Sequence, residues 1–384
     1  MFETFTLTPN QRTPSVPRAA GFRPRNRSTT GSARAVASAA LTIALIGSVA
    51  TVAQADAFDL YGPATPFDLP SGAGPFDAMR DGRLITLVGD ELFAETAVGS
   101  RSFDSIGRLE GGDFSDFGPA FVEVSPDGTR VAIGNGGGAG FDHYQVGVFD
   151  LGDLSGDWFN VNHFSAAWFD DRSLALAAGV FGSPAFVTML DITGDPENPT
   201  NPLLIDGVGG ASGGIAFDAE GRLFTGNGFQ TQGPSTTGTL KSFDATDWMA
   251  AWRGGDAVDF ETSGSLIAEL LSAGSLGFDS EGHLHVGGGD FDEGDFDYGA
   301  LIRASAIVDA LGGRGPVDRD DPDRVRRFDP DGADDFNFYS LGYNAFTGEL
   351  YVRQGSRVYP FIVPEPGTCL LMVLGAAVVL RRRS

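Results

Sequence analysis

The stretch GIAFDAEGRLFTGNG (214–228) decides the fold, because it holds two short apolar runs separated by the four residues from Asp218 to Gly221. An Asp side chain favours a local turn, and a Gly shortly after it accepts the positive φ angle that tight turns need. Two apolar runs joined in this way predict a β-hairpin. The stretch therefore predicts two adjacent antiparallel strands.

The same pattern occurs five more times, with 44 to 66 residues between successive turns. The other copies are FDAMRDGRLITLVG (76–89), FVEVSPDGTRVAIGNG (121–136), AAWFDDRSLALAAG (166–179), SLGFDSEGHLHVGGG (275–289) and LGYNAFTGELYVRQG (341–355). A further apolar run ending on an acid follows in the best cases: QVGVFD (145–150), FVTMLD (186–191), TLKSFD (239–244) and, as a third or fourth strand, VRRFD (325–329). Repeats of about 40–50 residues with four strands each are typical of a β-propeller. We therefore predict an all-β fold that forms a single β-propeller.

The number of copies predicts the number of blades. Six copies across residues 56–363 predict a six-bladed ring; a seven-bladed ring with one eroded copy inside residues 290–340 is the alternative. The last copy ends at Val363 without an outermost strand, whereas AFDLY (57–61) is apolar and strand-like. We expect residues 57–61 to fill that edge, because an open sheet edge invites aggregation.

Composition supports one large all-β domain. Among 384 residues, 55 are Gly and 21 are Pro, which disfavours a helical bundle, and 42% are hydrophobic, which is too many for a disordered chain. The formal net charge is −25, and residues 56–363 hold 17 basic against 49 acidic side chains. A surface this acidic repels nucleic acid, so nucleic-acid binding is excluded. The single cysteine, Cys369, excludes a disulfide framework and Cys-based chemistry in this domain.

The N-terminus has the features of a signal peptide. An Arg-rich stretch precedes the small apolar run AVASAALTIALIGSVATVA (35–53), and Ala53 and Ala55 form an A-x-A cleavage site. We predict that residues 1–55 are a signal peptide with a long basic n-region, removed by signal peptidase before Asp56. An uncleaved membrane helix is the alternative.

The C-terminus has three parts in a fixed order. Pro364, Glu365 and Pro366 precede the apolar run TCLLMVLGAAVVL (368–380), and Arg381, Arg382 and Arg383 follow it. The run has 13 residues, fewer than the ~20 that span a bilayer comfortably, and the arginines form a positive-inside stop. A core helix is the alternative interpretation of the run.

This tail, residues 364–384, resembles the PEP-CTERM sorting signal of exported proteins from exopolysaccharide-producing Gram-negative bacteria. The resemblance implies that Pro364, Glu365 and Pro366 are recognised by an exosortase-type processing enzyme. It also implies that the apolar helix holds the protein at the inner membrane only transiently, as a hydrophobic address does in other sorting signals. The expected location is the cell surface or extracellular matrix, with exopolysaccharide or biofilm as the setting.

The repeats resemble NHL-type and lactonase-type propeller repeats, and MLDITGDPENPT (189–200) is similar to the LVIVD-type repeat. This resemblance implies architecture and leaves the chemistry open, since propellers host many unrelated functions. In lactonase-type propellers, polar residues at strand ends bind a divalent ion in the channel. Asn135 and Asn227 occupy such positions in two copies, although Asn-Gly pairs are also common in turns.

Two other groups are candidates for metal binding. His283 and His285 alternate on one strand, where we expect a solvated or rim-facing pair rather than metal ligands. Five acids crowd one segment, and their oxygens could bind Ca²⁺ weakly: Asp290, Asp292, Glu293, Asp295 and Asp297. They do not form an EF-hand frame, so a solvated acidic loop is the alternative.

No H-E-x-x-H, Walker or dinucleotide-binding motif occurs in the sequence. We therefore expect a non-enzymatic binding or scaffold domain on an exported protein. The alternative is a metal-dependent, lactonase-like hydrolase that uses the propeller channel. A cluster of Asp, Glu and Asn converging at the channel mouth would favour the enzyme, and a channel lined by Gly and Phe would favour the binding protein.

Overall fold

The computed structural model describes residues 57–112, 114, 120–135, 144–179, 185–209, 212–227, 238–270, 272–288, 299–328 and 339–362. The predicted signal peptide (1–55), the acidic segment at 290–297 and the sorting tail (364–384) lie outside the described residues. Among the described residues, no helix has the length and apolar character needed to cross a membrane.

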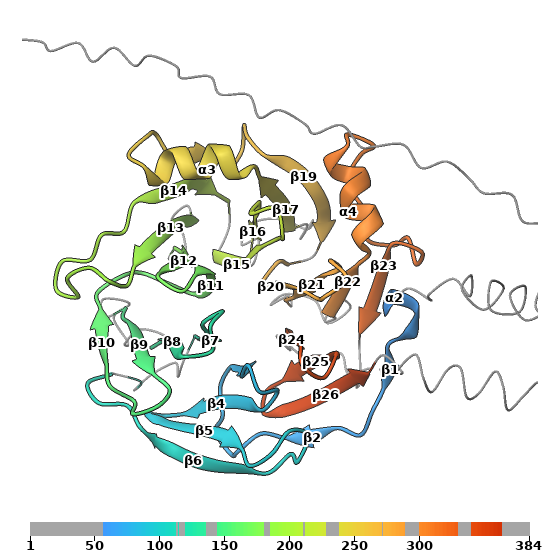
Figure 1. Ribbon diagram of the computed structural model, residues 1–384. Helices are drawn as coiled ribbons and strands as arrows, with labels where there is room; N and C mark the ends of the chain where they lie inside the picture. Colours follow the sequence, from blue (N-terminus) through green and yellow to red (C-terminus); the bar gives the residue numbers. More distant parts are fainter. Residues whose placement is uncertain are drawn as a thin grey trace, which may run out of the picture. The chain divides into compact units, whose positions relative to one another are not determined.

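The described strands form six antiparallel sheets arranged around one centre, which makes the fold a six-bladed β-propeller (Figure 1). Blades 1 to 3 follow in chain order: β3 (Phe76–Ala78), β4 (Leu84–Val88), β5 (Glu91–Glu95) and β6 (Phe103–Arg108); β7 (Phe121–Val124), β8 (Arg130–Gly134), β9 (Val146–Asp150) and β10 (Gly156–Phe159); β11 (Ser165–Asp170), β12 (Ser173–Ala178), β13 (Ala185–Asp191) and β14 (Leu203–Val208). Blade 3 gains β18 (Val258–Asp259), which pairs parallel with β14.

Blades 4 to 6 complete the ring. Their strands are β15 (Ser212–Phe217), β16 (Leu223–Asn227), β17 (Gly238–Phe243) and β19 (Ser265–Leu270); β20 (Ser275–Phe278), β21 (Leu284–Gly287), β22 (Gly299–Ile302) and β23 (Val325–Phe328); β24 (Tyr339–Asn344), β25 (Glu349–Gln354) and β26 (Arg357–Ile362). The count of six blades confirms the prediction from the repeats and removes the seven-bladed alternative.

Every predicted hairpin forms the two innermost strands of one blade. In five of the six, the turn glycine has a φ angle between +70° and +87°, a region that L side chains rarely adopt: Gly82, Gly128, Gly221, Gly282 and Gly348. In the sixth hairpin, the Arg172 N–H donates to Oδ1 of Asp170, so an Asp side chain supports the turn without glycine. The turn chemistry that identified the repeats therefore builds each blade.

The ring is closed by an N-terminal clasp, which we define as residues 57–68. Two short strands of the clasp, β1 (Gly62–Pro63) and β2 (Phe67–Asp68), pair antiparallel with β26 at the outer edge of blade 6 (Figure 1). The N-terminal segment therefore covers the outer edge of the last blade, as expected. The prediction that residues 57–61 form the covering strand was wrong, however. Residues 57–60 form the short helix α2 (Ala57–Leu60).

The spacing of two aromatic side chains explains the helix. Phe58 and Tyr61 are three residues apart, so a helical turn places both on one side, whereas an extended strand would place them on opposite faces. Both are buried, and they pack with Leu301, Phe328 and Phe361 of blades 5 and 6. Burial of both rings thus decides the local structure.

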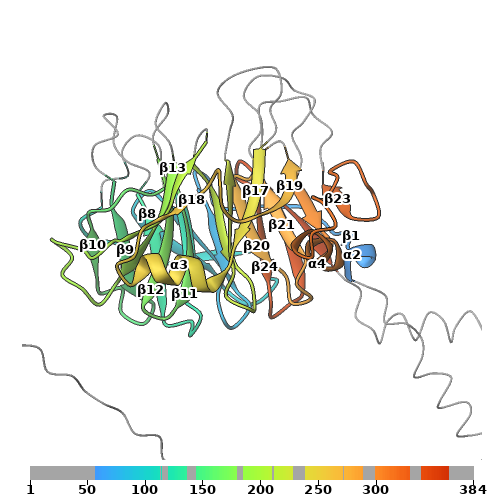
Figure 2. The same ribbon diagram turned by 90° about the horizontal axis from the view of Figure 1, so that it is seen from above.

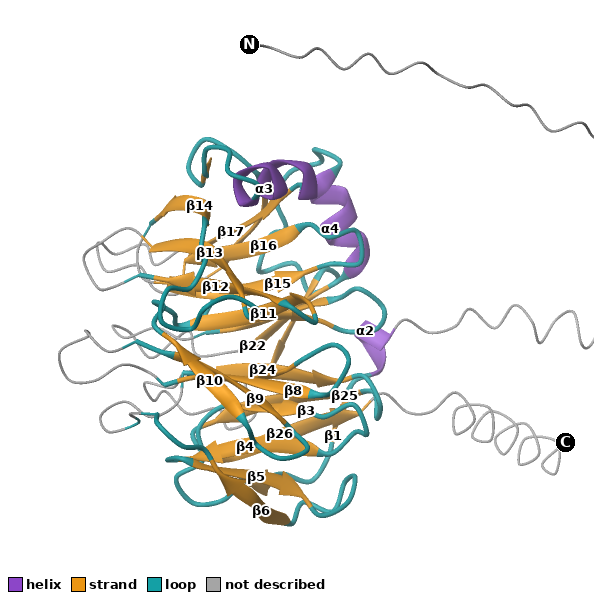
Figure 3. Cartoon of the chain, turned by 60° about the vertical axis from the view of Figure 1, so that its left-hand side comes forward, coloured by secondary structure: helices purple, strands orange, loops and turns teal. Residues whose placement is uncertain are grey.

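Two longer helices lie at the outside of the ring (Figure 1, Figure 2). Helix α3 (Ala245–Trp252) contacts β14, and its Trp248 is fully buried beside Phe260 in the core between blades 3 and 4. Helix α4 (Ala304–Leu311) contacts β19 in the same way. Figure 3 shows that strands make up most of the described part, with the helices at its border. The core is therefore divided into apolar layers between neighbouring sheets.

Candidate functional site

The channel is lined by the innermost strand of each blade: β3, β7, β11, β15, β20 and β24. Each of these strands pairs on one side only, so its free backbone edge faces the centre of the ring (Figure 1). Blades 4 and 5 approach closely there: a Cβ atom on Gly214 would lie 2.6 Å from the Leu276 nitrogen, and the Gly214 N–H donates to the Ala273 carbonyl (2.5 Å). The inner strands of blades 4 and 5 therefore meet backbone to backbone at this point.

The carboxyl groups of Asp77 and Glu123 lie on the neighbouring inner strands β3 and β7. The N–H groups of Val124 and Ala78 donate to Asp77, each at 2.7 Å, so Asp77 links blade 1 to the free edge of blade 2. The indole N–H of Trp168 donates to the main-chain carbonyl of Glu123 (3.1 Å), which links blade 3 to blade 2. Three blades thus meet at this pair.

Burial changes the protonation of both carboxyls. Each side chain keeps some contact with solvent, although protein surrounds it on most sides. Burial raises the pKa of Asp77 to about 6, in spite of the two backbone N–H groups that favour the charged form. Burial, and then the nearby charge of Asp77, raises the pKa of Glu123 well above its usual range. The two groups therefore titrate as a pair and retain protons at mildly acidic pH.

The asparagines that resemble lactonase positions hydrogen-bond to backbone at strand ends. Oδ1 of Asn135 accepts from the Gln145 N–H (2.9 Å), and Oδ1 of Asn227 accepts from the Thr239 N–H (3.0 Å). Both side chains are buried. No group of three or more His, Cys, Asp or Glu in the described part of the chain is placed to hold a metal ion.

His283 and His285 are both buried, so the solvated arrangement, one of the two expected for this pair, was wrong. The Ala304 N–H donates to Nδ1 of His283 (2.9 Å), and the ring packs edge-on against Phe58 of the clasp. Burial lowers the pKa of His285 to about 3, so this imidazole is neutral at pH 7. Periodicity could not reveal this burial, because the clasp that covers blade 5 is more than 200 residues away in the sequence. The acidic segment from Asp290 to Asp297 lies outside the described residues, so Ca²⁺ binding stays a prediction.

A cavity of about 940 Å³ lies between blades 2 and 3. We call it the blade 2–3 cavity. Its walls come from the start of β9, the connection from β10 to β11, strand β13 and the residues around the start of β14. Four carboxamide side chains line it, together with two aromatic rings and a threonine: Gln145, Asn160, Asn162, Asn201, Tyr144, Phe186 and Thr188.

Three of these lining residues hold buried polar atoms that have no hydrogen-bond partner among the described residues. They are Oη of Tyr144, Oγ1 of Thr188 and Oδ1 of Asn201. Leaving a buried polar atom unpaired costs about 1–3 kcal/mol, so native proteins rarely do so without a reason. Each of these three atoms exposes almost no surface, so the groups that the cavity offers to a ligand are the carboxamides of its lining and not these atoms.

No pattern in the sequence predicts this cavity. Asn160 and Asn162 lie in one connection, and Asn201 lies in another, where asparagine is ordinary. The repeat pattern aligns the inner strands, whereas these residues lie farther out along the blades. Only the packing of blade 2 against blade 3 brings them together.

Comparison with known proteins reveals fold similarity only. No protein-family model and no curated protein matches the sequence. Similar solved structures include a gluconolactonase from Xanthomonas campestris (12% identity, 78% of this chain and 88% of that chain, TM-score 0.49) and a streptogramin B lyase (8%, 80% and 99%, 0.44). A chain of the mitotic checkpoint complex is similar to the same degree (10%, 79% and 96%, 0.47). Similarities this distant say nothing about activity. The number of six blades comes from the strand pairing within this protein.

Proposed function

We propose that this protein is an exported binding or scaffold protein, and that its propeller binds a ligand in the blade 2–3 cavity. The gathering of four carboxamide side chains on one cavity carries this proposal: Gln145, Asn160, Asn162 and Asn201. They surround a space of about 940 Å³, close to the upper end of the roughly 300–1,000 Å³ typical of small-molecule pockets. A binding site offers polar groups of this kind to its ligand.

Binding is favoured over lactonase-like hydrolysis by the contacts of the two asparagines. A metal-dependent hydrolase of the lactonase type would need oxygen ligands that face the channel. The side-chain oxygens of Asn135 and Asn227 instead accept backbone N–H groups across β8–β9 and β16–β17. The carboxyl of Asp77 links blade 1 to blade 2, and burial raises the pKa of both Asp77 and Glu123, which suits a structural role better than metal binding.

The cellular part of the proposal is supported by the two ends of the sequence. Signal peptidase would cleave after Ala55, and an exosortase-type enzyme would process the tail at Pro364 to Pro366 after the apolar run has held the protein at the inner membrane. The mature propeller would then reside at the cell surface or in the extracellular matrix, in contact with exopolysaccharide.

Thermal-shift screening of the purified protein tests the binding function. We expect some small polar compounds to raise the melting temperature of the wild type, because a ligand that binds only the folded state stabilises it. The Asn201→Leu variant should lose this shift. A lactone-hydrolysis assay on wild type, Asn135→Ala and Asn227→Ala is run in parallel. Metal-dependent hydrolysis that disappears in either variant would favour the enzyme instead.

A further inference from the structure

We infer that one end of blade 6, where Phe346 and Ile362 are exposed, is a membrane-contact surface that lies against the bilayer while the apolar run 368–380 holds the protein there. This inference rests on the cellular part of the proposed function and names the surface through which the folded domain meets the lipid. Three observations support it: the place where β26 ends, the short link from there to the apolar run, and the apolar side chains exposed at that place.

The last strand of the propeller ends beside a hairpin turn of the same blade. Glu349 pairs with Asn344 of β24 on one side and with Ile362 of β26 on the other. The turn between β24 and β25 and the end of β26 therefore lie together at one end of the sheet. We call residues 345–349 and 362 the blade 6 tip.

The link between the blade 6 tip and the apolar run is short. Six peptide bonds join Ile362 to Thr368, the first residue of the run, and a fully extended chain of that length spans at most about 22 Å. The headgroup layer takes up about 5–7 Å of this length, so Ile362 lies within about 17 Å of the lipid surface. A domain of about 300 residues has a radius of gyration of about 19 Å and is therefore about 50 Å across. The tip is thus the part of the domain that meets the bilayer.

The blade 6 tip exposes apolar side chains. Among the described residues, five large hydrophobic side chains are exposed, and two of them belong to the tip: Phe346 (66% exposed) and Ile362 (38%). Phe346 is the one aromatic residue of the five. An apolar ring is unfavourable in water and favourable at the boundary between headgroups and acyl chains. The bilayer that holds the apolar run offers that boundary to Phe346.

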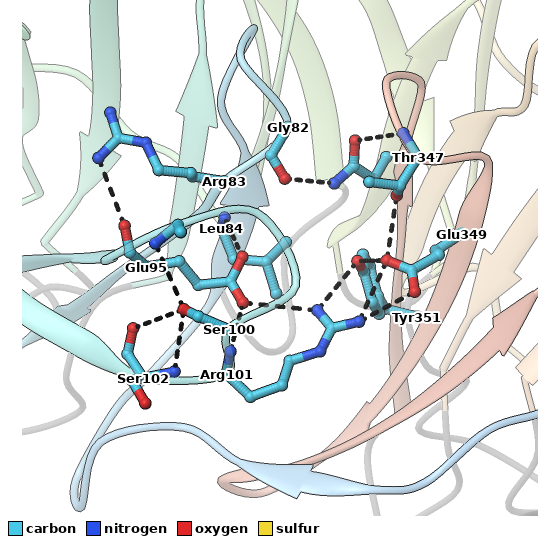
Figure 4. Close-up of polar contacts among 12 residues, drawn as sticks. Gly82, Arg83, Leu84, Glu95, Ser100, Arg101, Ser102, Thr347, Glu349 and Tyr351 are labelled. Atoms are coloured by element: carbon cyan, nitrogen blue, oxygen red, sulfur yellow. Dashed lines mark hydrogen bonds and ion pairs between the residues drawn. The ribbon is translucent and has the colours of Figure 1, made fainter.

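Hydrogen bonds hold the turn that carries Phe346. The Phe346 N–H donates to Oδ1 of Asn344 (3.0 Å), and Nδ2 of Asn344 donates to the Gly82 carbonyl of blade 1 (2.8 Å; Figure 4). The turn is therefore fixed to the neighbouring blade, and it presents the ring without first having to become ordered.

Ion pairs lower the repulsion between the tip and anionic lipid. Glu349 pairs with Arg101 (2.9 Å), and Asp81, which precedes Gly82, pairs with Arg83 (2.8 Å). Residues 56–363 as a whole hold 17 basic against 49 acidic side chains, so most of the domain surface is repelled by anionic headgroups. Acids that already have a cation add less to this repulsion.

The test measures how close two ends of blade 6 lie to the lipid. The full-length protein with Cys369→Ser receives one new cysteine, which carries a fluorescent label. Ala345→Cys places the label in the tip, and Ser356→Cys places it in the exposed turn between β25 and β26, at the other end of β26. The six residues of β26 separate the two positions by about 20 Å. The protein is reconstituted into vesicles of phosphatidylethanolamine and phosphatidylglycerol that carry a spin-labelled headgroup as quencher.

We expect the label at position 345 to be quenched at least about twofold more than the label at position 356, because only the tip lies at the headgroup layer. Phe346→Ser, added to the Ala345-labelled protein, should remove about half of the quenching, since the tip loses its apolar ring. Val308→Ser is the matched control, because Val308 is 64% exposed but lies on α4, which contacts β19 of blade 4. Circular dichroism verifies folding, and flotation verifies that the protein is held by the vesicles.

The outcomes separate this inference from the proposed function. If the protein floats with the vesicles but both labels are quenched equally, or the label at position 356 more strongly, the tip does not face the membrane, and the cellular proposal stands. If Phe346→Ser leaves the quenching at position 345 unchanged, the role assigned to Phe346 is wrong. If the protein does not float, the apolar run does not hold it in a bilayer, and both this inference and the inner-membrane step of the proposed function fail.

Discussion

Arg101 of blade 1 and Glu349 of blade 6 form an ion pair across the closing seam of the ring, with Nη2 of Arg101 2.9 Å from Oε1 and 3.1 Å from Oε2 of Glu349 (Figure 4). The Arg101 backbone N–H also donates to Glu95 (2.9 Å), and its guanidinium lies 4.5 Å from the centre of the Phe67 ring. One side chain thus contacts blade 1, blade 6 and the clasp. Arg101 adopts a φ angle of +56°, which the surrounding contacts must hold in place.

Arg101→Ala should destabilise the protein by about 2–4 kcal/mol, because it leaves the buried carboxylates of Glu95 and Glu349 without their cation. Urea denaturation measures this loss. The control is Arg108→Ala, whose exposed ion pair with Asp90 should contribute less than about 1 kcal/mol. Equal effects of the two substitutions would contradict a special role for the seam.

Phe58→Ala should destabilise the protein by about 3–5 kcal/mol, since it removes a buried ring from the junction of blades 5 and 6. The free energy of unfolding in urea gives the value. Phe346→Ala is the matched control, because that ring is 66% exposed and should contribute far less. A Phe58→Ala variant as stable as the control would show that the clasp does not hold the ring.

Stability should fall as the pH rises from about 4 through 6, because Asp77 and Glu123 have pKa values above those of an unfolded chain. A folded state that binds more protons than the unfolded state loses stability with rising pH in the interval between the two sets of pKa values. Glu123→Gln should remove part of this slope. Melting temperatures from pH 4 to 7 for wild type, Glu123→Gln and the surface control Glu197→Gln test this. Parallel wild-type and Glu123→Gln curves would rule it out.

Thr188→Val should stabilise the ligand-free protein by up to about 1 kcal/mol, because a methyl group of the same shape replaces a buried hydroxyl that has no partner among the described residues. Thermal unfolding without added ligand provides the measurement, with Thr200→Val as control. A marked loss of stability would mean that the Thr188 hydroxyl already serves the fold.

Glu365→Ala should leave the protein full length and held in the inner membrane, because it alters the segment that resembles an exosortase recognition site. Mass spectrometry of the C-terminus in membrane and surface fractions is the measurement. An intact tail on wild-type protein at the cell surface would refute the processing step.

Local turn chemistry made most of the ring predictable from the sequence. Hairpins such as that around Gly221 depend only on a few adjacent residues, and their repetition fixes six blades. The helix at Phe58 was not predicted, because its cause is burial against strands near the other end of the chain. The meeting of Tyr144 and Asn201 and that of Asp77 and Glu123 likewise depend on which residues neighbouring blades bring together, and no sequence period encodes that.

The clasp also has a consequence for the order of folding. Gly62 pairs with Ile362, so the first strand of the propeller to leave the ribosome must wait for the last one. Contacts between such distant residues form slowly, because a very long loop must close before they give any stability. Until then, one edge of β26 is unpaired, and residues 62–68 of a second copy of the chain could pair with it. High protein concentration during refolding should therefore favour exchange of this segment between copies.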